Sequence, residues 1–286
     1  MFRVVVRISL CLALLSACAP GPATVPAPDT TSPTPAPRAT SGTTTPPAPE
    51  PTTLAPGTNH NRAATTSAVP AATVQKWLTS PPESKHVFLT FDDGPNHAMT
   101  PKILDVLKEV EAPATFFVLG KEVEAAPDVL KREVAEGHAV GLHSYSHNYR
   151  RLYPQRRGDK DAILDEFDTS LAAVRRVLGA DFTPAPWRYP GGHMSWKDLT
   201  AADEALASRG AHWIDWNALT GDAEPKERRP ATAAAMVEMA TRPIREGCHA
   251  VVLLAHDAPD KALTLATLPA VVAAYRSAGY EFNVIG

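Results

Sequence analysis

The stretch His86-Val87-Phe88-Leu89-Thr90-Phe91-Asp92-Asp93-Gly94-Pro95 decides the fold. An apolar run with β-branched and aromatic residues is followed by two carboxylates and a Gly-Pro pair, which favours a buried strand that ends in a turn. A helical pattern comes next, because apolar residues recur at helical spacing between residues 100 and 110. This order predicts the first strand–turn–helix unit of an α/β domain.

The same alternation of strand and helix continues to the end of the chain, about seven times in all. Repetition of this unit argues for an α/β fold with a parallel sheet. Further strands are expected at residues 114–119, 139–142, 186–188, 211–216, 250–255 and 281–285, and further helices at 127–136, 159–178, 200–209, 231–244 and 263–277.

Polar residues gather where the expected strands end, and this distribution separates a barrel from an open sheet. Functional residues at the carboxyl ends of many strands are typical of a (β/α) barrel. We therefore predict an irregular (β/α) barrel with about seven parallel strands. The residues at these ends are Asp92 and Asp93, His143 and His147, Arg188, Asp222 and His256.

The amino-terminal part of the chain has a different composition. Arg3 and Arg7 precede an apolar run that is too short for a permanent membrane span, which predicts a signal peptide over residues 1–17. Leu15-Ser16-Ala17-Cys18 resembles the bacterial lipobox, in which the cysteine receives a lipid; plain secretory cleavage is the alternative. We expect membrane attachment through a lipid on Cys18 and an extracytoplasmic location.

Residues 18–72 follow as an expected linker. They consist mainly of Pro, Thr, Ala, Ser and Gly and include about half of the chain's 28 prolines, so they predict a disordered tether, with His60 inside it. Residues 73–286 have ordinary globular composition and are long enough for one catalytic domain. Once Cys11 is removed and Cys18 is lipidated, Cys248 stands alone, so no intramolecular disulfide is expected.

Charge excludes one class of partner. The net charge is −3 with mixed signs along the globular part, so no electrostatic footprint indicates nucleic acid. We expect a monomer.

Two short motifs carry the candidate chemistry. Asp92-Asp93-Gly94-Pro95 is either a polar turn or, with a cation present, a metal ligand beside a general base. His143-Ser144-Tyr145-Ser146-His147 places two imidazoles four residues apart, and if the segment is helical both can meet one metal. Each motif alone also occurs by chance. Two histidines with one carboxylate, however, are the usual ligands of a hydrolytic zinc site.

Five motifs in order resemble the polysaccharide deacetylases of the NodB type, carbohydrate esterase family 4, from about residue 85 to residue 285. The resemblance implies that Asp93, His143 and His147 bind a divalent metal, with zinc expected and cobalt or nickel as alternatives. It further implies Asp92 as general base, Arg188 as its partner, His256 as general acid, and the Gly191 N–H as a donor to the oxyanion. The motifs are Thr90–Pro95, Ala114–Gly120, His143–His147, Arg188–Gly192 and Leu254–His256.

The fourth family motif departs from the common pattern. Asp222 aligns with the aspartate that orients the acid histidine, and Asp215 is a rival that we expect to be structural. Ala223 stands where many relatives have Trp, Leu219 where many have Asp, and Gly191 where a Tyr is common. These changes put the shape of the sugar site in question.

The resemblance implies removal of N-acetyl groups from a polysaccharide, and the expected location favours N-acetylglucosamine of peptidoglycan. The alternatives are an O-acetyl esterase on xylan, a chitin-oligosaccharide deacetylase and, from another class, a catalytically silent glycan-binding lipoprotein. Trp187 and Trp216 are expected in the core, and His97 and His193 are weaker candidates for substrate contact.

Overall fold

A computed structural model describes residues 52–286. The expected signal peptide, the lipid site at Cys18 and the first part of the linker therefore lie outside the described residues. The helices are η1 (Ala63–Thr66), α1 (Ala71–Trp77), α2 (Thr100–Glu109), α3 (Gly120–Ala125), α4 (Pro127–Ala135), α5 (Tyr149–Leu152), η2 (Pro154–Arg156), α6 (Lys160–Leu178), η3 (His193–Ser195), α7 (Thr200–Ala207), α8 (Ala233–Glu246) and α9 (Ala262–Ser277). The strands are β1 (Ala68–Val69), β2 (His86–Asp92), β3 (Ala114–Val118), β4 (Ala139–Leu142), β5 (Pro186–Trp187), β6 (His212–Trp213), β7 (Ala218–Leu219), β8 (Ala250–His256), β9 (Glu281–Phe282) and β10 (Val284–Ile285).

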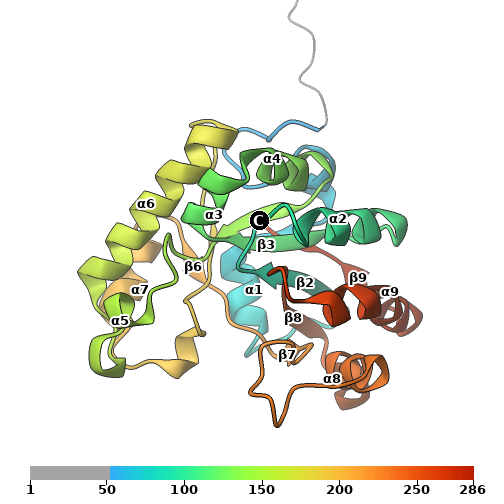
Figure 1. Ribbon diagram of the computed structural model, residues 1–286. Helices are drawn as coiled ribbons and strands as arrows, with labels where there is room; N and C mark the ends of the chain where they lie inside the picture. Colours follow the sequence, from blue (N-terminus) through green and yellow to red (C-terminus); the bar gives the residue numbers. More distant parts are fainter. Residues whose placement is uncertain (1–51) are drawn as a thin grey trace, which may run out of the picture. The chain divides into compact units, whose positions relative to one another are not determined.

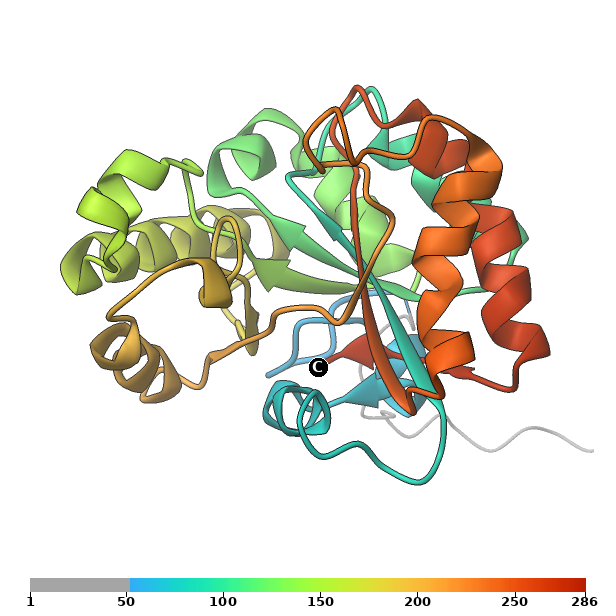
Figure 2. The same cartoon turned by 90° about the horizontal axis from the view of Figure 1, so that it is seen from below.

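The main sheet confirms the predicted α/β architecture. Its strands run in the order β6-β5-β4-β3-β2-β8-β7, with every neighbouring pair parallel and β9 added beside β2. The strands lie at the centre with helices around them, and α8 and α9 lie side by side next to β8 (Figures 1 and 2). None of the helices within residues 52–286 is long and apolar enough to cross a membrane.

One continuous segment joins the two edges of the sheet. The strand expected at residues 211–216 is shorter than predicted, because only β6 lies within that range. A second short strand, β7, follows at residues 218–219 and was not predicted; β6 pairs with β5, and β7 pairs with β8. Between them Asn217 pairs with β8 through its side chain and its backbone: its Nδ2 donates to the Ala250 carbonyl at 2.8 Å, its Oδ1 accepts from the Val252 N–H at 2.9 Å, and its N–H donates to the Val252 carbonyl at 3.3 Å. The sheet curls into an irregular barrel that is not fully closed, because its edge strands β6 and β7 do not pair with each other.

The last expected strand is divided into two. Residues 281–285 form β9, which pairs with β2, and β10, which pairs with β1. The partner of β10 comes from the expected tether, so the prediction of disorder through residue 72 is wrong for residues 52–72. This segment contains η1, β1 and the start of α1, and His60 is buried within it rather than lying in a loose linker. The composition of residues 52–72 is typical of a linker, but their ordered structure comes from contacts with strands far away in the sequence.

Alternation along β2 places the first carboxylate inside the barrel. Val87, Leu89 and Phe91 belong to the core under the helices, whereas Phe88 packs in the interior cluster with Phe117. Successive side chains of a strand point to opposite faces. Thr90 and Asp92 therefore share the interior face with Phe88, and the interior changes from apolar to polar towards the carboxyl end of the strand.

Candidate active site

Two carboxylates emerge at the end of β2 in different environments. Asp92 is buried at 2% exposure, and Asp93 follows with a φ of +83°, in the left-handed region that a residue with a side chain rarely adopts. The turn is held from β8, because Asp257 donates its N–H to the Asp92 carbonyl at 3.2 Å. The Asp257 carboxylate lies under Gly94 so closely that a Cβ on Gly94 would overlap it.

The two histidines lie on a loop, so a helix is not what brings them together. His143 follows β4 directly, and Ser144 and His147 have φ values of +73° and +59°. Buried Glu166 of α6 holds the loop: it accepts the N–H groups of Tyr145 and Ser146 at 2.9 and 2.7 Å. The charged acceptor fixes a turn that brings both imidazoles to one point without a helix.

Asp93, His143 and His147 form a group that could hold a metal ion. One ligand atom from each lies within 4.8 Å of the others. The Asp93 Oδ1 is 3.8 Å from the His143 Nε2 and 3.6 Å from the His147 Nε2. Two imidazole nitrogens and a carboxylate oxygen suit a zinc-type ion and leave further coordination positions open.

The protonation of His143 favours ligation. Its Nδ1 lies 2.8 Å from the Arg188 carbonyl, which can only accept, so Nδ1 carries the hydrogen and Nε2 keeps its lone pair. Burial, then the charge of His147, lowers the pKa of His143 to about 3. Burial also lowers the pKa of His147, against the opposing effect of Asp93. Both imidazoles are therefore neutral at pH 7, as metal ligands must be.

Arg188 pairs with Asp92 in the interior of the barrel. Its Nη1 donates to the Asp92 Oδ1 at 2.7 Å and to the Thr90 Oγ1 at 2.8 Å, and neither Arg188 nor Asp92 has significant exposure. The guanidinium also stacks over the Phe117 ring, 3.9 Å from its centroid. This buried cation fixes the position of the Asp92 carboxylate in the interior of the site.

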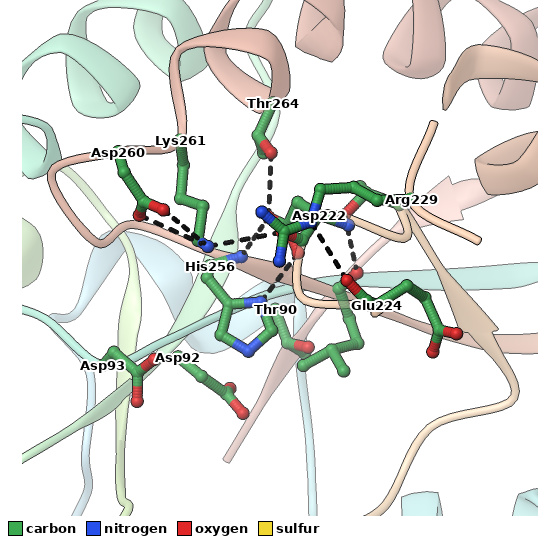
Figure 3. Close-up of polar contacts among 12 residues, drawn as sticks. Thr90, Asp92, Asp93, Asp222, Glu224, Arg229, His256, Asp260, Lys261 and Thr264 are labelled. Atoms are coloured by element: carbon green, nitrogen blue, oxygen red, sulfur yellow. Dashed lines mark hydrogen bonds and ion pairs between the residues drawn. The ribbon is translucent and has the colours of Figure 1, made fainter. Parts of the chain in front are cut away.

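His256 and Asp222 form a second pair on the opposite wall of the site. The Asp222 Oδ1 lies 2.8 Å from the His256 Nδ1, and its Oδ2 accepts from the His256 N–H and the Thr264 hydroxyl. Figure 3 shows Asp222 held between His256, Thr264 and Lys261, with Asp92 and Asp93 on the other side of the imidazole. Burial lowers the pKa of His256, but hydrogen bonding and charge from Asp222 outweigh it and raise the value to about 9.

The rival aspartate has a structural role, as expected. Asp215 accepts the N–H groups of His193 and Met194 at 2.8 and 3.1 Å. It thus anchors the loop that begins at Gly191, where φ is +78°. The Gly191 N–H has no hydrogen-bond acceptor among residues 52–286. It is therefore available to a ligand.

Seven of the eight predicted site residues line one cavity of about 280 Å³. The eighth, Arg188, lies directly behind Asp92. The cavity also contains residues that the sequence did not assign to the site. Trp216 is among them: it packs against the core cluster of Phe88 and Phe117, as expected, and also lines the cavity, whereas Trp187 is fully buried. Other lining residues are Tyr149, Leu219, Ala223, Glu224 and Leu254.

Comparisons with known proteins agree with this constellation. Residues 79–208 match the polysaccharide deacetylase family. A peptidoglycan-N-acetylglucosamine deacetylase of Bacillus cereus is 32% identical over 206 residues, which are 70% of this chain and 69% of that protein. A Bradyrhizobium chitooligosaccharide deacetylase is 34% identical over 53% of this chain and 68% of its own length. The structure of a Streptococcus mutans carbohydrate esterase family 4 esterase superposes with a TM-score of 0.79 at 43% identity, covering 83% of this chain and all of the other.

This chain belongs to the polysaccharide deacetylase family. It is therefore a hydrolase of the NodB, carbohydrate esterase family 4 type, as the motifs predicted. The family match ends at residue 208, before Asp222 and His256. Geometry independently brings these two residues to the same cavity as Asp93 and the paired histidines.

Some residues that shape this deacetylase site were not predicted from the sequence. Glu166 occupies the apolar face of α6 beside Ile163 and Phe167, and a carboxylate at such a position was the available signal. Asp257 directly follows His256, but nothing local indicated that it supports the Asp92–Gly94 turn. Tyr149 lies just beyond the His143–His147 motif and had no signal of its own.

Two weaker histidine candidates lie outside the cavity lining. His97 is exposed and pairs with Asp128 at 3.0 Å. His193 stacks on Trp213, with ring centroids 3.9 Å apart, and pairs with Asp203. Neither lines the cavity with Asp93 and the paired histidines.

Proposed function

We propose that this deacetylase is metal-dependent and removes N-acetyl groups from N-acetylglucosamine of peptidoglycan. The observation that carries the proposal is one cavity shared by the Asp93–His143–His147 cluster, the Arg188-paired Asp92 and the Asp222-paired His256. Metal-assisted amide hydrolysis requires a set of metal ligands, a general base and a general acid. Here the three lie around one cavity. A catalytically silent binding protein would have no need of all three.

The three ligands fit a divalent cation, and zinc suits two neutral imidazoles and a carboxylate best, with cobalt or nickel as alternatives. When bound, such an ion would activate water and polarise the acetyl carbonyl. Asp93 and His147 would hold it from opposite loops, and the hydrogen bond from His143 to the Arg188 carbonyl would fix the ligating nitrogen.

The remaining residues would handle protons and charge. Asp92, held in place by Arg188, would accept a proton from the attacking water. His256, whose raised pKa keeps it protonated at pH 7, would donate a proton to the departing amine. Asp222 would orient that imidazole through Nδ1. The Gly191 N–H would donate to the acetyl oxygen as negative charge develops there.

The glycan is inferred from relatives and from the expected location. The Bacillus cereus relative is named for peptidoglycan, the Bradyrhizobium relative for chitooligosaccharides and the Streptococcus mutans structure as an esterase. A signal peptide over residues 1–17, a lipid on Cys18 and an extracytoplasmic location would bring peptidoglycan within reach. Cys18→Ala should abolish lipid labelling in cells, and retained labelling would remove the anchoring proposal.

Acetate release tests the function directly. Purified protein should release acetate from peptidoglycan faster than from chitin oligomers or acetylated xylan. Exhaustive chelation should abolish release from all three, and added zinc or cobalt should restore it. Full activity without metal would contradict the metal site, and a strong preference for acetylated xylan would assign an esterase instead.

A further inference from the structure

Tyr149 lines the active-site cavity between a metal-binding candidate and the loop of Gly191. Its ring lies beside His147, with centroids 5.0 Å apart. It begins α5, immediately after the loop of the paired histidines, and the residue is 43% exposed. A phenol hydroxyl is therefore present at the cavity wall, although none of the family motifs contains this residue.

The hydroxyl lies where a side chain on Gly191 would project. A Cβ on Gly191 would be 3.3 Å from the Tyr149 Oη and 3.2 Å from Trp196 Cζ2. Gly191 has no side chain to fill this space, and Tyr149 reaches it from another loop. The Tyr149 hydroxyl is thereby brought close to the backbone at the point where the Gly191 N–H is also without an acceptor in the described part of the chain.

Packing orients the ring but leaves the hydroxyl free. Trp196 lies behind Tyr149 at a centroid distance of 5.4 Å, stacks on Tyr153 at 4.1 Å and donates its indole N–H to the Pro190 carbonyl at 2.9 Å. No residue between 52 and 286 forms a hydrogen bond with the Tyr149 hydroxyl. A supported ring that presents an unpaired donor to a cavity is preorganised to bind a ligand oxygen.

We propose that Tyr149 is a catalytic residue whose hydroxyl donates a hydrogen bond, beside the Gly191 N–H, to the acetyl oxygen of the substrate. This inference rests on the proposed deacetylase function. The bond strengthens as the oxygen gains negative charge during water attack, so it stabilises the transition state more than the bound substrate. The site then has two neutral donors at the oxyanion, one from the backbone and one from a side chain of a different loop.

Tyr149→Phe tests the proposal because it removes only the oxygen and keeps the ring against His147 and Trp196. We expect kcat on a soluble chitin oligomer to fall by about 10- to 100-fold, with KM changed less than about twofold and full zinc content. Tyr153→Phe is the matched control. Its hydroxyl is buried without a partner and its ring stacks on the same Trp196, but it does not line the cavity, so both constants should stay within about twofold.

Two results would overturn the proposal while the deacetylase function stands. Normal kcat in Tyr149→Phe, with an active wild type, would show that the hydroxyl does not stabilise the oxyanion. A raised KM with unchanged kcat would assign the hydroxyl to ground-state sugar binding instead. Failure of the zinc-loaded wild type to release acetate from any of the three substrates would overturn the proposed function and this inference together.

Discussion

The two ends of the barrel differ in how their polar groups are satisfied and in how much backbone strain they contain. At the amino end, Asn59 donates its Nδ2 to the carbonyls of Val140 and Ile285 at 3.0 and 2.8 Å, and the Asn59 carbonyl accepts the Val140 N–H. Thr115 accepts the Ile285 N–H at 2.9 Å. These buried backbone groups are hydrogen-bonded, and the pairing of β1 with β10 adds further regular structure at this end.

At the carboxyl end, the chain tolerates strain and concentrated charge. Asp93, Ser144 and His147 all have positive φ, which costs of order 1 kcal/mol or more for each residue with a side chain. Asp92 and Arg188 are removed from water, which is unfavourable unless both stay paired. The amino end therefore contributes stability, and the carboxyl end carries function at a cost in stability, as expected where local rules are broken at a site.

Removal of a metal ligand should give the largest loss of function at the carboxyl end. Asp93→Ala and His143→Ala should lose bound metal and at least about 10³-fold in acetate release, because water activation requires the ion. Elemental analysis and initial rates provide the measurements. His97→Ala is the control, since this exposed histidine pairs with Asp128 away from the cavity. Metal retention by Asp93→Ala with normal turnover would rule out the assigned ligand set.

Asp92→Asn separates the base from the ligands. The variant keeps an acceptor oxygen for Arg188 but cannot accept a proton, so the rate should fall by about 10² or more while bound zinc is retained. The unpaired charge left on buried Arg188 should also lower the free energy of unfolding. Near-normal turnover would mean that another group acts as base. Asp105→Asn, on the outer face of α2, should change neither property.

The His256–Asp222 pair predicts a shift in pH dependence. The raised pKa of His256 keeps its acid form up to about pH 9, and activity should fall as pH rises through that value. In Asp222→Asn the attraction between the Asp222 carboxylate and protonated His256 is lost, while burial still lowers the pKa of His256. The fall in activity at alkaline pH should therefore begin at a lower pH than in the wild type. A cation bound at the Asp93–His143–His147 cluster would lower the pKa of His256 in both proteins, so the two kcat–pH profiles are to be compared at equal zinc loading. Identical alkaline limits would show that Asp222 does not set this titration.

The smallest effect on activity is expected at the amino end. Asn59→Ala removes two hydrogen bonds to buried carbonyls, which should lower the free energy of unfolding by about 1–3 kcal/mol. Zinc content and kcat should not change, because the site lies at the other end of the strands. Arg62→Ala, an exposed neighbour in the same segment, is the control for chemical denaturation. A large fall in kcat for Asn59→Ala would show that the two ends are coupled.

The sequence by itself determined the strand ends and the residues placed there. Apolar runs such as residues 86–91 are local signals, and a parallel strand that is buried on both faces needs such a run. Alternation then set the interior position of Asp92. The order of the motifs indicated the family, and the resemblance to that family also implied the Asp222–His256 pair.

Only the tertiary structure decided how these residues are held. The positive φ values at Ser144 and His147 depend on buried Glu166 from a distant helix, and no local propensity predicts them. The order of residues 52–72 was hidden by a composition typical of linkers and arises from pairing with β4 and β10. Tyr149 reaches Gly191 only after two loops meet. In each case the deciding contact joins residues far apart in the chain, so its energy is absent from any single segment.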